Sequence, residues 1–149
     1  MLKKIAYVLG TGFGSGYVPV APGTAGSLAA LLVFYFIPLS AYYWLVLCAV
    51  VFIPGVWSTT LIEREEGKKD PPMAVIDEWV GQWLTLLFLP RTTLILLGGF
   101  LLFRILDILK PFPARKIQNI DGGMGIMLDD VMAALYANMI MHILLLFHY

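Results

Sequence analysis

The segment AVIDEWVGQW, residues 74–83, places two adjacent carboxylates inside an apolar and aromatic stretch. From Pro71 to Pro90, Asp77 and Glu78 are the only charged side chains. Either this pair lies at the water-facing end of a hydrophobic helix, or it holds a charged group that the protein requires. The rest of the chain bears on which explanation is correct.

The composition predicts that the chain lies in a membrane. Of its 149 residues, 60% are hydrophobic, and the mean hydropathy is +0.84, whereas a soluble domain has about 45–50% apolar residues. A domain of this size has too much surface to hide so many apolar side chains from water. We expect one domain, residues 1–149. The net charge is zero, so we expect no nucleic-acid partner, which would require a basic stripe.

Five apolar stretches predict the helices of this domain. The predicted ranges are 25–39, 41–62, 72–89, 92–109 and 126–147. The connections at 38–41 and 90–92 are very short, which favours antiparallel neighbours. The expected fold is therefore all-α, a polytopic membrane bundle of about four to five antiparallel helices. The first range is short for a full crossing, so whether residues 25–39 span the membrane stays open.

The basic residues indicate which side of the membrane each end faces. If the N-terminus and the connections at 63–71 and 110–125 share one side, that side carries Lys3, Lys4, Arg64, Lys68, Lys69, Arg104, Lys110, Arg115 and Lys116. Only Arg91 falls on the other side. By the positive-inside rule, the shared side is cytoplasmic. We therefore interpret residues 1–10 as a mature N-terminus on the cytoplasmic side.

The acidic residues gather at the same depth. Asp77 and Glu78 open the third predicted helix, and Asp107 closes the fourth. Asp129 and Asp130 open the fifth. One explanation is that acids at helix starts complement the helix dipole. Carboxylates that converge in an apolar setting repel one another, however, unless a cation or basic side chains neutralise them. Oxygen-only ligands suit hard cations such as Mg²⁺.

Basic side chains accompany Asp107. Arg104, Asp107 and Lys110 are spaced i, i+3, i+6, so they share one face of the fourth predicted helix. Arg104 and Asp107 could form a purely structural ion pair. Alternatively, Asp107 is a metal ligand while Arg104 and Lys110 bind a phosphate group. The sequence leaves both explanations open.

Two glycine-rich segments precede predicted helices on the acidic side. The first is GTGFGSGYVPVAPGTAGS, residues 10–27, and the second is DGGMG, with Gly122 and Gly123. Both could be ordinary helix-entry loops, with Thr24 or Ser27 as a cap in the first. Both could also bind an anion, because glycines permit close approach and expose backbone N–H groups.

Three longer blocks carry a distinctive pattern. They are GFGSGYVPVAPGTAGSL at 12–28, DPPMAVIDEWVG at 70–81 and FRILDILKPFPARKIQNIDGGMGIMLDDVMAALYA at 103–137. Together they resemble the phosphatidylglycerophosphatase A family over nearly the whole chain. The third block is similar to the family pattern F-R-x-x-D-x-x-K-P-x-P…G-G-x-G-I-M-x-D-D, which is too long for a chance match.

The resemblance implies an activity, a cofactor and a location. Family members hydrolyse phosphatidylglycerol phosphate to phosphatidylglycerol and inorganic phosphate, with Mg²⁺, at the bacterial inner membrane. We therefore expect a multi-pass inner-membrane enzyme of phospholipid biosynthesis, a phosphoric monoester hydrolase whose active site faces the cytoplasm. Its partner would be a phospholipid substrate in the membrane. The oligomeric state stays open.

On this hypothesis, one or two Mg²⁺ ions polarise the phosphoryl group and activate an attacking water. The expected metal ligands and catalytic residues are Asp77, Glu78, Asp107, Asp129 and Asp130, with Asp70 as an additional ligand or base. The expected substrate-binding residues are Arg104, Lys110, Thr24, Ser27, Gly122 and Gly123. Two alternatives stay open. A small ion or metal transporter predicts polar groups through the full membrane depth, and a non-catalytic scaffold predicts tolerance of single carboxylate-to-amide changes.

Overall fold

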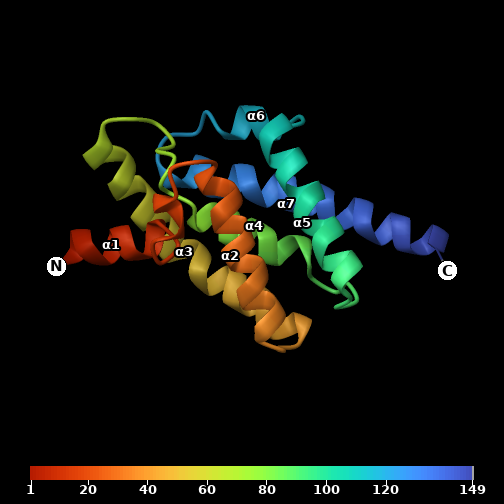
Figure 1. Cartoon of the computed structure of the whole chain (residues 1–149). Helices are drawn as coiled ribbons and strands as arrows, with labels where there is room; N and C mark the ends of the chain where they lie inside the picture. The colour runs from red at the N-terminus through yellow and green to blue at the C-terminus, as the bar shows by residue number, and fades with distance from the viewer. Residues whose placement is uncertain (149) are drawn as a thin grey trace.

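Helices make up all the regular structure in the computed structural model, which describes residues 1–148 (Figure 1). Along the chain the elements are α1 (Leu2–Gly10), the short 3₁₀ helix η1 (Ser15–Tyr17), α2 (Pro22–Phe36), α3 (Ala41–Glu66), α4 (Ile76–Thr85), α5 (Thr93–Leu109), α6 (Ala114–Ile117) and α7 (Gly123–His148). The prediction of an all-α chain is confirmed for these residues. Tyr149, the last residue of the predicted domain, lies outside the described part.

Four of the predicted helices match α2, α3, α5 and α7, with shifted ends. Helix α2 begins earlier than predicted because Pro22 occupies its first turn, where a proline loses no helical hydrogen bond. Helix α3 continues past the predicted end and stops before Gly67, whose positive φ of 62° suits glycine at a helix terminus. Helix α7 begins at Gly123, within the DGGMG segment.

The predicted helix over 72–89 is wrong in extent, because α4 has only ten residues. At 1.5 Å per residue this helix is about 15 Å long. It lies in the middle of the molecule (Figure 1) and packs against α2, α3, α5 and α7. Eight of its ten residues are buried, among them Trp79, Val80 and Trp83. A helix that is buried on nearly all sides is stable only when other helices surround it.

Because α4 ends inside the bundle, its last carbonyl groups cannot all reach water. The side chain of Asn138 on α7 donates hydrogen bonds of 2.9 Å to the carbonyl oxygens of Thr85 and Leu87. The chain then continues through turns to Pro90, with Phe88 at a positive φ of 60°. Asn138 therefore satisfies acceptors that would otherwise be buried without a partner.

The N-terminal segment forms a helix that the sequence interpretation missed. Helix α1 packs against α3, where Lys3 Nζ lies 2.5 Å from Glu65 Oε2. The Tyr7 hydroxyl donates a 2.6 Å hydrogen bond to Glu66 Oε1. In this run two adjacent lysines are followed by apolar residues, and the small residues Ala6 and Gly10 are buried one helical turn apart. The short helix α6 was also not predicted.

Arg91, the only cation predicted on the far side, lies at the C-terminal end of α2. Its guanidinium donates to the carbonyl oxygens of Tyr35 and Ile37, each at 3.3 Å, and lies 4.3 Å from the ring centre of Phe34. The two short connections therefore meet at one end of the bundle. Gly23, at the opposite end of α2, lies beside Glu78.

Two helices among residues 1–148, α3 and α7, are long and apolar enough to cross a membrane. Only 28% and 22% of their most apolar windows are buried. On α3 the exposed apolar side chains include Val46, Val50 and Ile53, which recur at helical spacing. The core helix of a soluble protein would be mostly buried, so this surface is consistent with contact to lipid. Helix α2 is apolar but shorter, and the number of crossings stays a prediction.

Replacing Asn138 by leucine removes the two hydrogen bonds that cap α4. We expect Asn138→Leu to lower the free energy of unfolding by about 1–3 kcal/mol, because two carbonyl groups lose their donor. Unfolding of the purified protein in mixed detergent micelles measures this difference. The control is Asn119→Leu, at an exposed residue, and equal stability of the two variants would contradict the proposed capping.

Candidate active site

Five of the predicted acids meet where α4, α5 and α7 approach one another. They form two groups that could each hold a metal ion, and in each group one oxygen per residue lies within 4.8 Å of the others. The first acid group is Asp77, Glu78 and Asp130, and the second acid group is Asp107, Asp129 and Asp130. Asp130 belongs to both groups.

The helix-dipole explanation applies to only two of these acids. Asp77 and Glu78 do lie in the first turn of α4, as predicted. Asp129 and Asp130 do not open α7, because this helix begins at Gly123 and has no acid in its first turn. The pair lies nearly two turns into α7, so the prediction that it opens this helix was wrong. Interaction with the helix N-terminus does not account for burying them.

Most of these carboxylates are withdrawn from solvent. The exposed fraction is 4% for Asp77, 8% for Asp107, 3% for Asp129 and 2% for Asp130. In the first acid group, Asp77 Oδ1, Glu78 Oε2 and Asp130 Oδ2 are buried without a hydrogen-bond partner. An ionised oxygen buried in this way is costly unless a cation is bound. The first acid group therefore fits a hard divalent ion, which prefers oxygen ligands.

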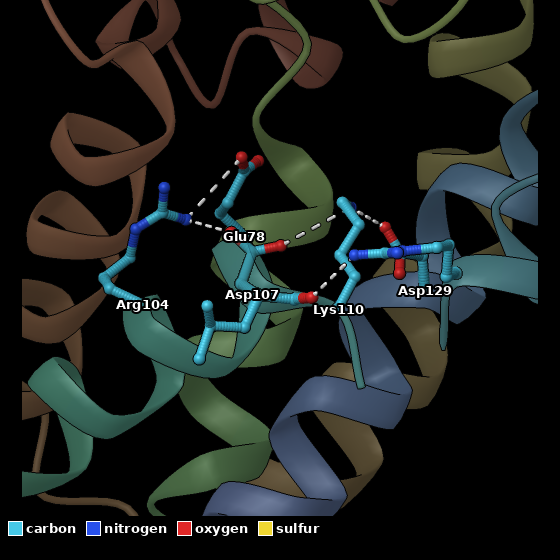
Figure 2. A network of polar contacts seen from close by, with 7 residues as sticks. Glu78, Arg104, Asp107, Lys110 and Asp129 are labelled. Carbon is cyan, nitrogen blue, oxygen red and sulfur yellow. Dashed lines mark hydrogen bonds and ion pairs between the residues drawn. The ribbon is translucent and has the colours of Figure 1, made fainter. Parts of the chain in front are cut away.

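Two basic side chains neutralise the second acid group. Arg104 pairs with Asp107, and its Nη1 atom lies 3.9 Å from Glu78 Oε1. Lys110 pairs with Asp129, and its Nζ atom lies 4.0 Å from Asp107 Oδ1 (Figure 2). The predicted ion pair between Arg104 and Asp107 is thus present. The Arg104 Nε atom remains buried without a partner, so one donor of this guanidinium is available.

Asp70 lies in the loop before α4 and belongs to neither acid group. Burial raises the pKa of Asp70 above its ordinary value; the charge of Lys110 opposes this effect and the charge of Asp107 adds to it. These interactions place Asp70 within electrostatic reach of the site. Burial by itself would lower the pKa of Lys110, but its hydrogen bond with Asp129 and the surrounding carboxylates raise it. Lys110 is therefore held as a cation.

The start of α2 closes one side of the site. A Cβ atom at Gly23 would lie 2.4 Å from Glu78 Oε1 and 3.0 Å from Arg104 Nη2, so any larger residue there would displace these two side chains. The sequence interpretation did not single out Gly23, although it lies in the glycine-rich segment. Neither Thr24 nor Ser27 caps this helix, because the N-cap is Ala21 and no side chain bonds there. The alternative that Thr24 or Ser27 caps this helix was wrong, and their role in substrate binding stays a prediction.

Two further polar side chains near this region lack partners. Ser27 follows Gly23 by one turn of α2 and is fully buried, with no hydrogen bond to its Oγ atom. Gln82 follows Glu78 by one turn of α4, and both polar atoms of its buried side chain are unpartnered. The sequence interpretation missed Gln82. An amide in an otherwise apolar helix was the signal that could have found it.

Gly122 and Gly123 make their closest contacts with α3. The Gly123 N–H donates a 2.8 Å hydrogen bond to Thr60 Oγ1, and a Cβ atom there would lie 2.1 Å from Thr59 Oγ1. Gly122 has a positive φ of 72°. These glycines let α7 begin in tight contact with α3. Their predicted role in phosphate binding stays a prediction.

Comparison of the sequence with known proteins identifies its family. The sequence pattern of the family described as Phosphatidylglycerophosphatase A matches residues 8–145. The chain belongs to the phosphatidylglycerophosphatase A family.

The relatives of this family are similar over most of their length. A phosphatidylglycerophosphatase A of Escherichia coli is 41% identical over 132 residues, covering 85% of this chain and 76% of that protein. Its counterpart in Haemophilus influenzae is 39% identical over 145 residues, covering 91% and 89%. A putative phosphatidylinositol-3-phosphatase of Bacteroides thetaiotaomicron is 42% identical over 139 residues, covering 87% of each chain. No solved structure matches.

Family membership identifies the protein as a phosphoric monoester hydrolase of phospholipid metabolism. The family acts on a phospholipid substrate. The resemblance expected from the sequence blocks is therefore confirmed, and the buried acidic groups are the part of the structure suited to such chemistry.

The fit of α2 against the site can be tested with two glycine substitutions. We expect Gly23→Ala to lower phosphatase activity at least tenfold, because the added methyl group displaces Glu78 and Arg104. Gly98→Ala is the control, since its Cβ atom would lie 3.5 Å from the nearest atom, an ordinary contact with Met141. Phosphate release by the two purified variants measures the difference, and similar activities would show that Gly23 does not shape the site.

Proposed function

We propose that the protein is a Mg²⁺-dependent phosphatidylglycerophosphatase, which hydrolyses phosphatidylglycerol phosphate to phosphatidylglycerol and inorganic phosphate. One observation carries this proposal. The first acid group has three unpartnered carboxylate oxygens, and one of its acids, Glu78, lies 3.9 Å from Arg104, a cation with an unpartnered donor atom. Acid oxygens that suit a hard cation, beside a guanidinium that suits phosphate, form the arrangement that phosphomonoester hydrolysis requires.

In this proposal Asp77, Glu78 and Asp130 hold the metal ion. A bound divalent ion supplies positive charge to the phosphoryl oxygens and lowers the pKa of a water molecule. Arg104 neutralises the charge on the phosphoryl group. Glu78 and Asp107 orient the guanidinium for this task, because both carboxylates contact its Nη1 atom.

Water is the proposed nucleophile, because the sequence contains no motif typical of enzymes that form an acylphosphate. Asp70 is the proposed base, since it lies outside both acid groups and is therefore not a ligand of either candidate metal position. Burial raises the pKa of Asp70, which brings its affinity for a proton closer to what a general base needs. Ser27 and Thr24 on α2 remain proposed contacts of the substrate.

The lipid setting follows from the surface of the bundle. Phosphatidylglycerol phosphate would keep its acyl chains against the exposed apolar faces of the helices and bring its headgroup to the acidic end. We propose a multi-pass protein of the bacterial inner membrane, with this end at the cytoplasmic face. The excess of basic residues in the connections at that end supports this orientation.

The first test is release of phosphate from phosphatidylglycerol phosphate in mixed micelles, with Mg²⁺ or with EDTA. We expect activity that requires Mg²⁺, and a loss of at least 100-fold in Asp77→Asn and in Asp130→Asn, because each change removes a charged ligand. Asp121→Asn, at an exposed acid outside both groups, is the matched control and should stay within about twofold.

Phosphatidylinositol 3-phosphate belongs in the same experiment, because the name of one relative points to it. Both lipids carry a phosphomonoester on a polyol headgroup. Faster hydrolysis of phosphatidylinositol 3-phosphate would contradict the proposed headgroup while leaving the phosphatase chemistry intact. Equal activity of the three variants and the wild type would contradict the catalytic role of the acids and favour the scaffold alternative.

The orientation can be tested by cysteine labelling on a Cys48→Ala background. Ser40 lies in the connection at the Arg91 end, and Lys69 lies in the loop before α4; both are exposed. In intact bacteria, a membrane-impermeant maleimide should label Ser40→Cys but label Lys69→Cys only after lysis. The opposite pattern would reverse the proposed orientation.

A further inference from the structure

The two acid groups differ in what neutralises them. In the first acid group, one oxygen of each of the three acids is buried without a partner. In the second acid group, Asp107 pairs with Arg104 and Asp129 pairs with Lys110. The two groups are adjacent because they share Asp130. The first acid group therefore offers an open position for a cation. The second acid group already contacts the cationic side chains of Arg104 and Lys110.

The ammonium group of Lys110 lies between the two acids that distinguish the second group. Its Nζ atom hydrogen-bonds Asp129 Oδ2 and lies 4.0 Å from Asp107 Oδ1. Figure 2 shows the Lys110 side chain between these two carboxylates. An ammonium is a compact point charge with three donors, so it can interact with several oxygens as a small metal ion does.

The backbone holds Lys110 in this position. Lys110 follows the last residue of α5 with φ 49° and ψ 66°, a left-handed conformation. Its N–H donates a 2.8 Å hydrogen bond to the carbonyl oxygen of Leu106. Glycine or asparagine is the usual residue at such a helix end. The chain therefore carries a long cationic side chain where the backbone alone would favour glycine.

We propose that the ammonium group of Lys110 occupies the second of two adjacent cation positions, so that the active site binds one divalent ion, at Asp77, Glu78 and Asp130. This inference rests on the proposed function, because it concerns the metal of that reaction. Lys110 is a positioning residue here: it holds Asp107 and Asp129 and keeps the second position closed to metal.

The charges of the site agree with one divalent ion. Five carboxylates and two cationic side chains leave three negative charges when all are ionised. One divalent ion reduces this excess to a single negative charge, before the anionic substrate binds. A second divalent ion could use Asp107 and Asp129 only after Lys110 had left them.

The experiment counts Mn²⁺ ions bound to the full-length protein in detergent, by calorimetry and by electron paramagnetic resonance. We expect one ion per chain in the wild type, with the spectrum of an isolated ion. Lys110→Gly should bind two ions with an exchange-coupled spectrum, because the two acid groups share Asp130. Glycine suits the positive φ of this position, so the variant should fold.

Lys110→Arg is the matched control, because it keeps the positive charge, and it should bind one ion. Two coupled ions on the wild type, or one ion on Lys110→Gly, would overturn this inference while leaving the metal-dependent function intact. A failure of all three proteins to bind Mn²⁺ would overturn the metal-dependent function itself, and the inference with it.

Discussion

Five carboxylates, four of them buried, lie at one end of an apolar helical bundle and must be neutralised there. Without compensation these acids would repel one another and would each lose their hydration. Arg104 and Lys110 compensate part of this charge through Asp107 and Asp129. The remaining oxygens belong to the first acid group, which could hold a cation. On the proposed function, the stability of the fold and the activity of the site therefore depend on the same charges.

Helix α4 carries Asp77 and Glu78 to the same level as the acids of α5 and α7. It is short and surrounded by four other helices, so its first turn lies at the acidic end while its last turn lies inside the bundle. Glycines permit the close contacts around it: a Cβ atom at Gly81 would lie 2.5 Å from Phe103, and one at Gly26 would lie 2.8 Å from Val75. Asn138 satisfies its buried C-terminal end. The glycine-rich character of the sequence thus reflects helix packing as much as contact with phosphate.

On the proposed function, the same site could serve lipid phosphates with different headgroups. Its charged groups would recognise the phosphomonoester, which phosphatidylglycerol phosphate and phosphatidylinositol 3-phosphate have in common. The relatives carry names that refer to both kinds of lipid. Discrimination between them must come from side chains that contact the polyol. Such contacts lie outside the acid groups, which offer only carboxylate oxygens.

The all-helical class, the approximate positions of α2, α3, α5 and α7, and the acids that meet at one level could all be predicted from the sequence. These follow from apolar runs of helical length and from charges confined to their ends, which are local properties of the chain. The true length of α4, the helix formed by residues 2–10, and the tight fit at Gly23 were decided only by the tertiary structure. Each depends on which helix lies opposite, and no local pattern contains that information. For the same reason, the sequence could place Lys110 beside Asp107 on one helix face, but only packing against α7 brought its ammonium group to Asp129.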